Sequence, residues 1–172
     1  MNTSRILSAL ALLTASTAFA AWTQDGDGSF SFDAKGPAGL KIHGDAKKLT
    51  VTDDGTTMKV QLKLEDVDTD NSLRNRHMLE DMKAKDNPMV NLTVPTASLC
   101  EKGGEATGTL ELNGQKKDTK FSYTPKCNGS SCEVEASAPV NLNDFGIKIR
   151  SYMGVTVKPD IVVTTKFKVV KK

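Results

Sequence analysis

Residues 58–65 read MKVQLKLE, a strict alternation of apolar and polar side chains. Successive side chains of a β-strand point to opposite faces, so this stretch predicts a strand with one dry face and one wet face. The same two-residue period recurs along most of the chain. It predicts strands at residues 29–32, 39–51 (interrupted at Lys47-Lys48), 58–64, 90–94, 110–112, 121–123, 134–140 and 161–169.

One segment breaks the alternation. Residues 71–85 read NSLRNRHMLEDMKAK, which is typical of a short helix, with Asp70 or Asn71 as its N-cap. Asp53-Asp54-Gly55 and Asn113-Gly114 are hairpin turn signals. Few strands have two apolar faces, which disfavours a parallel sheet, and an antiparallel sheet of this size tends to close. The sequence therefore predicts an all-β, antiparallel barrel of about eight strands with one short helix.

The strand register predicts which side chains face the barrel interior. Phe30, Leu62, Leu92, Val140 and Phe167 should point inward, together with small residues such as Ala136, Ala138 and Thr165. Aromatic residues make up 5% of the chain, so few large side chains are available to fill an interior. An eight-stranded barrel either is filled by side chains or holds one small ligand. The thin filling favours a cavity, with a packed core as the alternative.

Composition limits the classes of partner. The 172 residues suit one globular domain, and 23 Lys and Arg stand against 21 Asp and Glu. This near-balance disfavours nucleic acid as a partner, because a nucleic-acid-binding domain usually carries a clustered basic face. The few aromatics also disfavour a surface on which bases stack.

The first twenty residues have the pattern of a secretory signal peptide. They read MNTSRILSALALLTASTAFA, with Arg5 before an apolar run and Ala18-Phe19-Ala20 at the expected cleavage site. The apolar run is shorter than the roughly 20 residues that span a bilayer, which disfavours a membrane anchor. We expect residues 1–20 to be removed and residues 21–172 to form the working domain outside the cytoplasm.

Export to an oxidising compartment makes a disulfide the expected use of the cysteines. Cys127 and Cys132 flank Asn-Gly-Ser-Ser, a turn composition, and their pairing is favoured. Cys100 would then be a free thiol, while its pairing with either of the other two stays open.

The search for catalytic chemistry is negative. His43 and His77 are not at metal-ligand spacing and neither neighbours a cysteine, and no G-x-S-x-G, H-E-x-x-H or phosphate-binding glycine loop occurs. The sequence therefore predicts no catalytic residue, no metal, no cofactor and no enzymatic activity.

Four short motifs, in order along the chain, resemble those of the YceI-like family. Residues 68–78, DTDNSLRNRHM, are similar to its D-T-G-N-x-x-R-D-x-H-L segment, although Asp70 replaces the usual Gly and Asn75 the acidic residue. Residues 108–114, GTLELNG, resemble its G-x-L-x-I-x-G hairpin, and residues 143–147 contain its D-F-G-I segment. Gly154-Val155 followed by Asp160-Ile161 fits its closing motif. The resemblance covers nearly all of the expected mature chain, with the motifs in the right order.

The resemblance implies a lipocalin-like barrel in the bacterial periplasm that binds a polyisoprenoid or similar long amphipathic lipid. The inward face would then form the cavity wall. The expected wall residues are Phe32, Ile42, Val60, Leu62, Leu92, Leu110, Phe121, Val140, Phe145 and Phe167. Arg74, Arg76 and His77 are expected at the mouth, near a polar head group. A structural hydrogen bond that anchors the helix is the alternative role for Arg74.

Two functions from different classes follow from these observations. The first is a periplasmic binding protein that carries or sequesters an isoprenoid or quinone-like lipid. The alternative is a secreted stress-protective or protein-interaction domain whose barrel core is solid. A transient membrane contact and a homodimer are both left open by the sequence.

Overall fold

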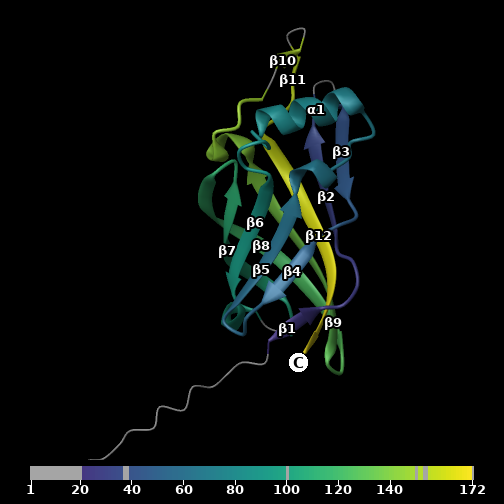
Figure 1. The fold of residues 1–172 in the computed structure, drawn as a ribbon, viewed down its shortest axis with the longest axis vertical. Coiled ribbons are helices and arrows are strands. Elements are labelled where there is room, and N and C mark those ends of the chain that lie inside the picture. The colour runs from purple at the N-terminus through teal and green to yellow at the C-terminus, as the bar shows by residue number, and fades with distance from the viewer. Residues whose placement is uncertain (1–20, 37–38, 100, 150, 153–154, 172) are drawn as a thin grey trace, which may run out of the picture.

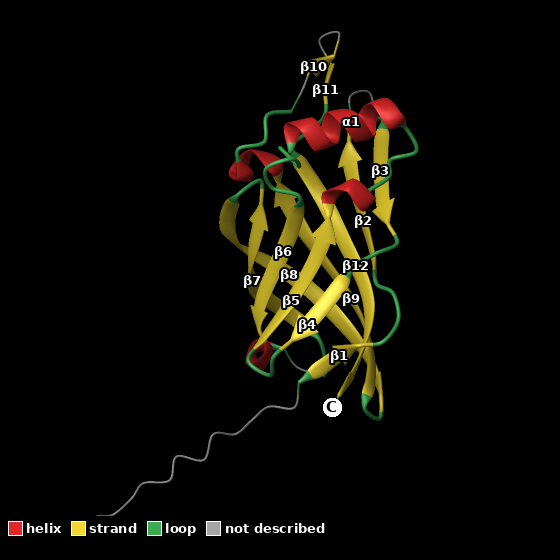
Figure 2. Ribbon diagram, in the orientation of Figure 1, coloured by secondary structure: helices red, strands yellow, loops and turns green. Residues whose placement is uncertain are grey.

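The computed structural model describes residues 21–36, 39–99, 101–149, 151–152 and 155–171. The expected signal segment and Cys100 lie outside these residues. The described chain is mostly β-strand, with one α-helix across one end (Figure 2). No helix in the described part of the chain has both the length and the apolar composition needed to cross a bilayer.

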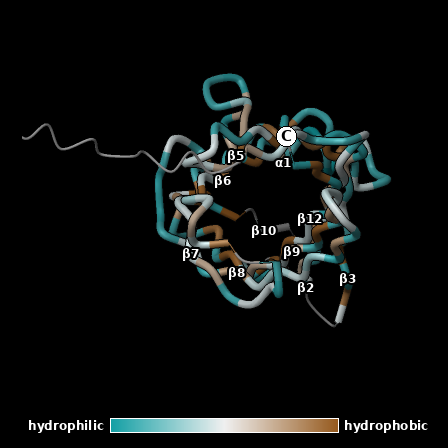
Figure 3. The backbone as a smooth tube through the Cα atoms, turned by 90° about the horizontal axis from the view of Figure 1, so that it is seen from below, coloured by the Kyte–Doolittle hydropathy of each residue, from teal (hydrophilic) through white to brown (hydrophobic). Residues whose placement is uncertain are grey.

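Eight antiparallel strands form a closed ring (Figure 1). The ring closes because the first strand pairs with both the fourth and the last. In ring order the strands are β1 (Trp22–Gln24), β4 (Thr50–Asp53), β5 (Thr57–Lys63), β6 (Met89–Pro95), β7 (Gly104–Leu112), β8 (Gln115–Asn128), β9 (Ser131–Asn141) and β12 (Asp160–Lys171). Viewed from the end opposite the helix, these strands surround a central axis (Figure 3). The predicted all-β antiparallel barrel is confirmed.

Two further strands extend the barrel toward the helix. β2 (Ser29–Lys35) pairs with the first half of β12, and β1 pairs with its last three residues. β3 (Lys41–Ala46) then pairs with the other edge of β2. A separate two-stranded ribbon, β10 (Ser151–Tyr152) and β11 (Val155–Thr156), lies beyond the same end (Figure 1). The expected strand over residues 39–51 is therefore two strands, β3 and β4, with a break at the predicted lysine pair.

The segment between β1 and β2 packs against the segment between β3 and β4. Gly28 lies against the buried side chain of Leu49, and a Cβ on residue 28 would come within 2.9 Å of Leu49 Cβ. Glycine at this position lets the two bends pack against each other. The barrel wall on this side is thus made from two broken strands.

The predicted hairpin turns are confirmed. Asn113 and Gly114 both have positive φ angles, 52° and 71°, as a two-residue hairpin turn requires. Gly55 has φ 87° in the turn between β4 and β5. The hairpin of β8 and β9 is closed by a disulfide between Cys127 and Cys132, which face each other in the register.

The helix α1 (Ser72–Asp81) begins at Asn71, whose side chain accepts a hydrogen bond of 3.0 Å from the backbone N–H of Arg74. This is N-capping at one of the two expected positions. The helix is shorter than the predicted 71–85, because Lys83 has φ 49° and cannot continue it. None of the ten residues of α1 is buried. The helix therefore covers the barrel end, where the partly buried Met78 packs against the core.

Candidate functional site

The barrel interior contains a cavity of about 610 Å³ under α1. Its wall is made by the inward side chains of the strands, and it reaches the surface at Asn71 and Leu73, which are exposed. The interior is therefore not filled by side chains at this end. The predicted inward orientation is confirmed, because Phe30, Leu62, Leu92 and Val140 line this cavity and Phe167 lines a second one deeper in the barrel.

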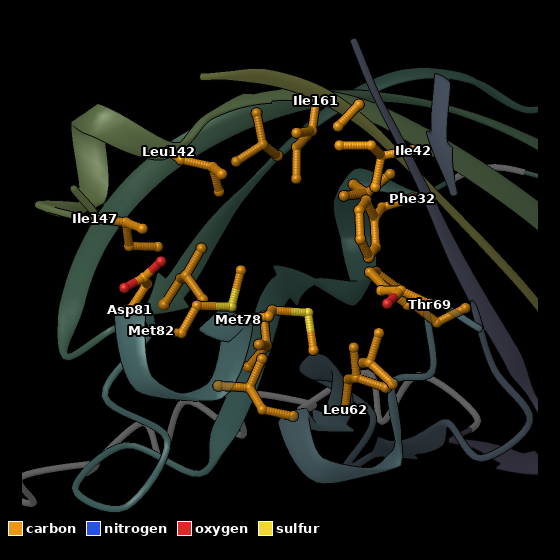
Figure 4. A pocket seen from close by; sticks show the side chains of 18 of the residues that line it. Phe32, Ile42, Leu62, Thr69, Met78, Asp81, Met82, Leu142, Ile147 and Ile161 are labelled. Carbon is orange, nitrogen blue, oxygen red and sulfur yellow. The ribbon is translucent and has the colours of Figure 1, made fainter. Parts of the chain in front are cut away.

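Eight of the ten expected wall residues line the main cavity. They are Phe32, Ile42, Val60, Leu62, Leu92, Leu110, Phe121 and Val140. The close view in Figure 4 shows Phe32, Ile42 and Leu62 directed into this space.

Two expected wall residues lie elsewhere. Phe167 lines the second, smaller cavity of about 100 Å³, because it is further along β12 toward the disulfide. Phe145 lines neither cavity. It lies in the 3₁₀ turn η4 (Leu142–Phe145), is 2% exposed, and its carbonyl accepts a hydrogen bond of 2.9 Å from the Asn113 side chain. Phe145 instead belongs to the buried core cluster that also contains Leu142 and Ile147.

Phe32 depends on a glycine in the adjacent strand. It faces Gly44 in the β2–β3 register, and a Cβ on residue 44 would come within 2.8 Å of Phe32 Cζ and nearer still to Cε1. The ring therefore occupies the space that a side chain at residue 44 would take. Glycine at this position lets the Phe32 ring pack closely against the β3 backbone.

Helix α1 supplies the rim. Arg74 and His77 line the cavity as expected, but Arg76 does not. The Arg76 side chain is 67% exposed, and its Nε lies 4.0 Å from Glu80 Oε1 on the outer face of the helix. Residues two apart on a helix do not share a face, so the spacing from Arg74 to Arg76 accounts for the difference.

Three further residues at this end of the barrel line the cavity, beyond those expected at its mouth. Met78 and Asp81 each lie four residues after an expected rim residue, and Met82 lies four after Met78. Figure 4 shows both methionine thioethers directed into the cavity, with the Asp81 carboxylate at its edge near Ile147. Methionine is flexible and adapts to irregular apolar surfaces. The helix thus presents a soft apolar surface with polar groups at its border.

Arg74 anchors the helix to the segment before it. Its Nε donates to Thr69 Oγ1 at 3.1 Å, and its Nη2 donates to the Thr69 carbonyl at 3.1 Å. Thr69 is 3% exposed and also lines the cavity. Arg74 thus makes the structural hydrogen bonds that were the alternative expectation for this residue, and it also lies on the cavity rim.

Asn75 completes this anchor. Its Oδ1 accepts from the Thr69 backbone N–H at 2.9 Å and from Thr69 Oγ1 at 2.6 Å, while its Nδ2 donates to Asp68 Oδ1 at 2.8 Å. The Asn75 amide and the backbone N–H of Asp70 hold the pKa of the Asp68 carboxyl below its ordinary value. Asp70, at the usual glycine position of the motif, has φ 58°. The loop before α1 is thus fixed by side-chain hydrogen bonds.

The polar residues of the cavity are few and lie mainly at the rim. Within the described residues no group of three or more His, Cys, Asp or Glu could hold a metal ion. A large apolar wall with a small number of polar groups at one end suits a ligand with a long apolar part and a polar head.

A sequence profile of the YceI-like domain matches residues 9–169. The chain belongs to the YceI-like family. Among curated relatives, a UPF0312 protein of Pseudomonas fluorescens is 29% identical over 144 residues, which cover 80% of this chain and 68% of that protein. A UPF0312 protein of Pseudomonas aeruginosa is 27% identical over 133 residues, which cover 73% of this chain and 61% of that protein. The matched part is thus less than two thirds of the P. aeruginosa relative.

Several solved structures share the fold at low sequence identity. A polyisoprenoid-binding domain of Saccharophagus degradans, implicated in plant cell wall breakdown, superposes with a TM-score of 0.69 at 13% identity, covering 89% of this chain and 99% of that chain. BcnA of Burkholderia cenocepacia gives a TM-score of 0.69 at 16% identity, covering 82% of this chain and 95% of that chain. The Campylobacter jejuni YceI protein gives a TM-score of 0.53 at 16% identity, covering 100% of this chain and 94% of that chain. The protein and these three solved structures therefore share one barrel fold.

Proposed function

We propose that this protein is an exported binding protein that holds the apolar chain of an isoprenoid, quinone-like or similar amphipathic lipid inside its barrel. The observation that carries the proposal is the 610 Å³ apolar cavity under α1, with Arg74, His77 and Asp81 at its rim. The name of the S. degradans relative, a polyisoprenoid-binding domain, supports the same ligand class. The protein would bind and carry or sequester this lipid without chemical change.

The energetics agree with this proposal. Burying a methylene group contributes about 0.8 kcal/mol, so about fifteen buried carbons contribute on the order of 12 kcal/mol. Association costs about 4–15 kcal/mol. A ligand that fills most of the cavity has a favourable balance, whereas a short one does not.

The proposal also covers location. The signal-like residues 1–20 favour export to the periplasm, where a lipid must be shielded from water to cross between membranes. The Cys127–Cys132 disulfide agrees with an oxidising compartment. The size of the cavity weighs against the alternative of a stress-protective domain with a solid core.

Mass measurement of the purified protein under native and then denaturing conditions tests the proposal. The expected result is one lipid-sized adduct under native conditions that is lost on denaturation. The proposal fails if the two masses agree and if added prenyl alcohols also leave no adduct.

Filling the cavity provides a second test. Val60→Trp should block lipid uptake with little change in thermal stability, because the indole enters empty space. In a solid core the same change would overpack the interior and cost about 1–3 kcal/mol. Val162→Trp is the matched control, because Val162 is 48% exposed on the outer face of β12.

A further inference from the structure

Four exposed lysines lie along one side of the cavity mouth. Each is next in sequence to a residue that lines the main cavity, so the apolar wall ends directly in a basic border. β2, β3 and the segments that flank the β10–β11 ribbon carry these lysines at the same end of the barrel as α1 (Figure 1). The four residues, which we call the lysine cluster, are Lys35, Lys41, Lys148 and Lys158. The adjoining wall residues are Ala34, Ile42, Ile147, Ile149 and Val157.

Backbone pairing holds the cluster together. Lys35 and Lys41 face each other in the β2–β3 register, and the Lys158 N–H donates to the Lys35 carbonyl at 2.8 Å. The next carbonyl, that of Pro159, accepts a hydrogen bond of 2.9 Å from the Leu142 N–H, where the turn that leads to the fourth lysine begins. The positions of the four lysines are therefore set by the barrel.

The cluster concentrates positive charge. Like charges directly opposite each other on neighbouring strands destabilise a sheet, and Lys35 and Lys41 are such a pair. In the part of the chain that the structure describes, the ion pairs of lysine are made by lysines outside the cluster. An anionic partner from outside the chain would relieve this repulsion.

Carboxylates on the same segments offset this charge only in part. Asp33 on β2 lies 2.9 Å from His43 Nδ1, and Asp160 accepts a hydrogen bond of 2.8 Å from the Asn141 side chain. Asp144 is exposed on η4. Across the mouth, α1 carries basic and acidic residues in equal number. The side of the mouth formed by β2, β3 and the ribbon segments is therefore the basic one.

An exposed leucine lies within the cluster. Leu40 directly precedes Lys41 and is 56% exposed. Leu73, at the mouth on α1, is 51% exposed. At a membrane surface such an apolar side chain enters the boundary between head groups and acyl chains, while neighbouring lysines contact anionic head groups. The mouth thus combines both features of a membrane-binding surface.

We propose that the lysine cluster and Leu40 dock this end of the barrel on a membrane that contains anionic phospholipids, with the cavity mouth toward the bilayer. A lipid surface presents many phosphate groups in one plane, which suits basic side chains spread over two strands and two loops. A bound lipid would then pass between bilayer and cavity without crossing water. The docking is independent of what the cavity holds, whereas its role in lipid exchange rests on the proposed function.

Cosedimentation of the full exported protein with vesicles tests the docking. Vesicles in which about a third of the lipid is phosphatidylglycerol and the rest phosphatidylcholine should bind the protein at least about tenfold more tightly than phosphatidylcholine alone. Raising the ionic strength from about 0.01 M to about 0.15 M should weaken this binding, because salt shortens the range of the attraction.

Variants assign the binding to the cluster. A lysine near an anionic surface contributes about fivefold in affinity, so Lys41→Gln/Lys158→Gln should bind the anionic vesicles about 25-fold more weakly than the parent. Lys102→Gln/Lys126→Gln is the matched control, because it removes the same charge from exposed positions at the disulfide end of the barrel. It should bind like the parent. Leu40→Ala should weaken binding by about tenfold, and this loss should persist at the higher salt concentration.

Several outcomes would overturn the docking. They are equal binding of the parent to both kinds of vesicle, binding to neither kind, and equal losses in the cluster and control double variants. Binding to neither kind is the result expected if the cluster instead meets an acidic protein. Unchanged binding of Leu40→Ala would contradict the insertion of that side chain.

Lipid transfer separates this inference from the proposed function. Uptake of a fluorescent prenyl alcohol from anionic vesicles should be slower in Lys41→Gln/Lys158→Gln than in the parent, at equal affinity for the free alcohol. Equal uptake rates would overturn the role of docking in exchange. If the parent docks on anionic vesicles but binds no prenyl alcohol, the lipid-binding function fails and the docking stands.

Discussion

The ring of Phe32 lies over Gly44, the residue that faces it on the neighbouring strand, and leaves no room for a side chain there. Phe32 also forms part of the cavity wall. Strand pairing and cavity shape are therefore coupled through one pair of residues.

Gly44→Ala should destabilise the protein by about 1–3 kcal/mol, because the added methyl group forces the Phe32 ring to move. The displaced ring would enter the cavity and also reduce lipid uptake. Denaturant unfolding measures the first effect and lipid titration the second. The double variant Gly44→Ala/Phe32→Leu should recover part of the lost stability. Equal losses in the single and double variants would contradict this coupling.

Arg74 and Arg76 offer a matched pair on one helix. Arg74→Ala should cost about 1–2 kcal/mol, because it removes two hydrogen bonds to Thr69 from a charged donor. Arg76→Ala should change the unfolding free energy by less than about 0.5 kcal/mol, because its contact with Glu80 is exposed. Chemical denaturation of both variants checks the difference. Similar losses would show that Arg74 does not anchor the helix.

The disulfide should stabilise the lower end of the barrel. Cys127 and Cys132 are five residues apart, and closing so short a loop is worth about 2 kcal/mol in the chain-entropy account. Replacing both cysteines by alanine should lower the unfolding free energy by that amount. A reducing agent should destabilise the parent and leave the double variant unaffected. An equal response of both proteins to the reducing agent would count against the disulfide.

Acid should weaken the loop before α1. Hydrogen bonds from Asn75 and Asp70 keep the pKa of Asp68 below its ordinary value of about 3.9. A carboxyl whose pKa is lower in the folded than in the unfolded protein stabilises the fold above its unfolded pKa. This contribution is lost as the pH falls through the folded pKa. Unfolding measured from pH 6 to pH 2 should therefore show a smaller acid-induced loss in Asp68→Asn than in the parent.

The Asp54 carboxyl gives an independent comparison. Its pKa is also lowered, by hydrogen bonds from the Thr56 side chain and from the Thr56 and Thr57 backbone, but it lies in the β4–β5 turn. Asp54→Asn should reduce the acid sensitivity separately, and the effects of the two variants should add because they share no partner. If Asp68→Asn loses as much stability in acid as the parent does, the Asp68 carboxyl does not contribute to the acid sensitivity.

The alternation along residues 58–64 and 161–169 made the barrel predictable, since a two-residue period fixes which side chains face inward. β1 escaped prediction because it has only three residues, which is too short to show a period. Its pairing with β4 and β12 closes the ring, and that pairing is a property of the whole fold. Local pattern therefore predicted the wall and a closed barrel, whereas the strand pairings that close it are known only from the tertiary structure.

The candidate site was predictable to the extent that it lies on regular strands. Phe145 was misplaced because it belongs to a 3₁₀ turn, where a two-residue period does not apply. Arg76 was misplaced although its helical spacing from Arg74 already puts it on another face. The sequence only favoured a cavity over a packed core. Whether the interior is empty depends on the summed volumes of many side chains across the barrel.

Photo-cross-linking tests the central claim most directly. A 20-carbon prenyl alcohol with a diazirine at the end of its chain would be bound to the protein, irradiated, and its attachment sites mapped by peptide mass spectrometry. The account predicts labelling inside the barrel, on the β5, β6, β8 and β12 peptides that contain Val60, Leu92, Phe121 and Thr165, the residues that line both cavities. Labelling confined to outward-facing residues such as Val162 would contradict this account. So would labelling of the protein that does not exceed the background.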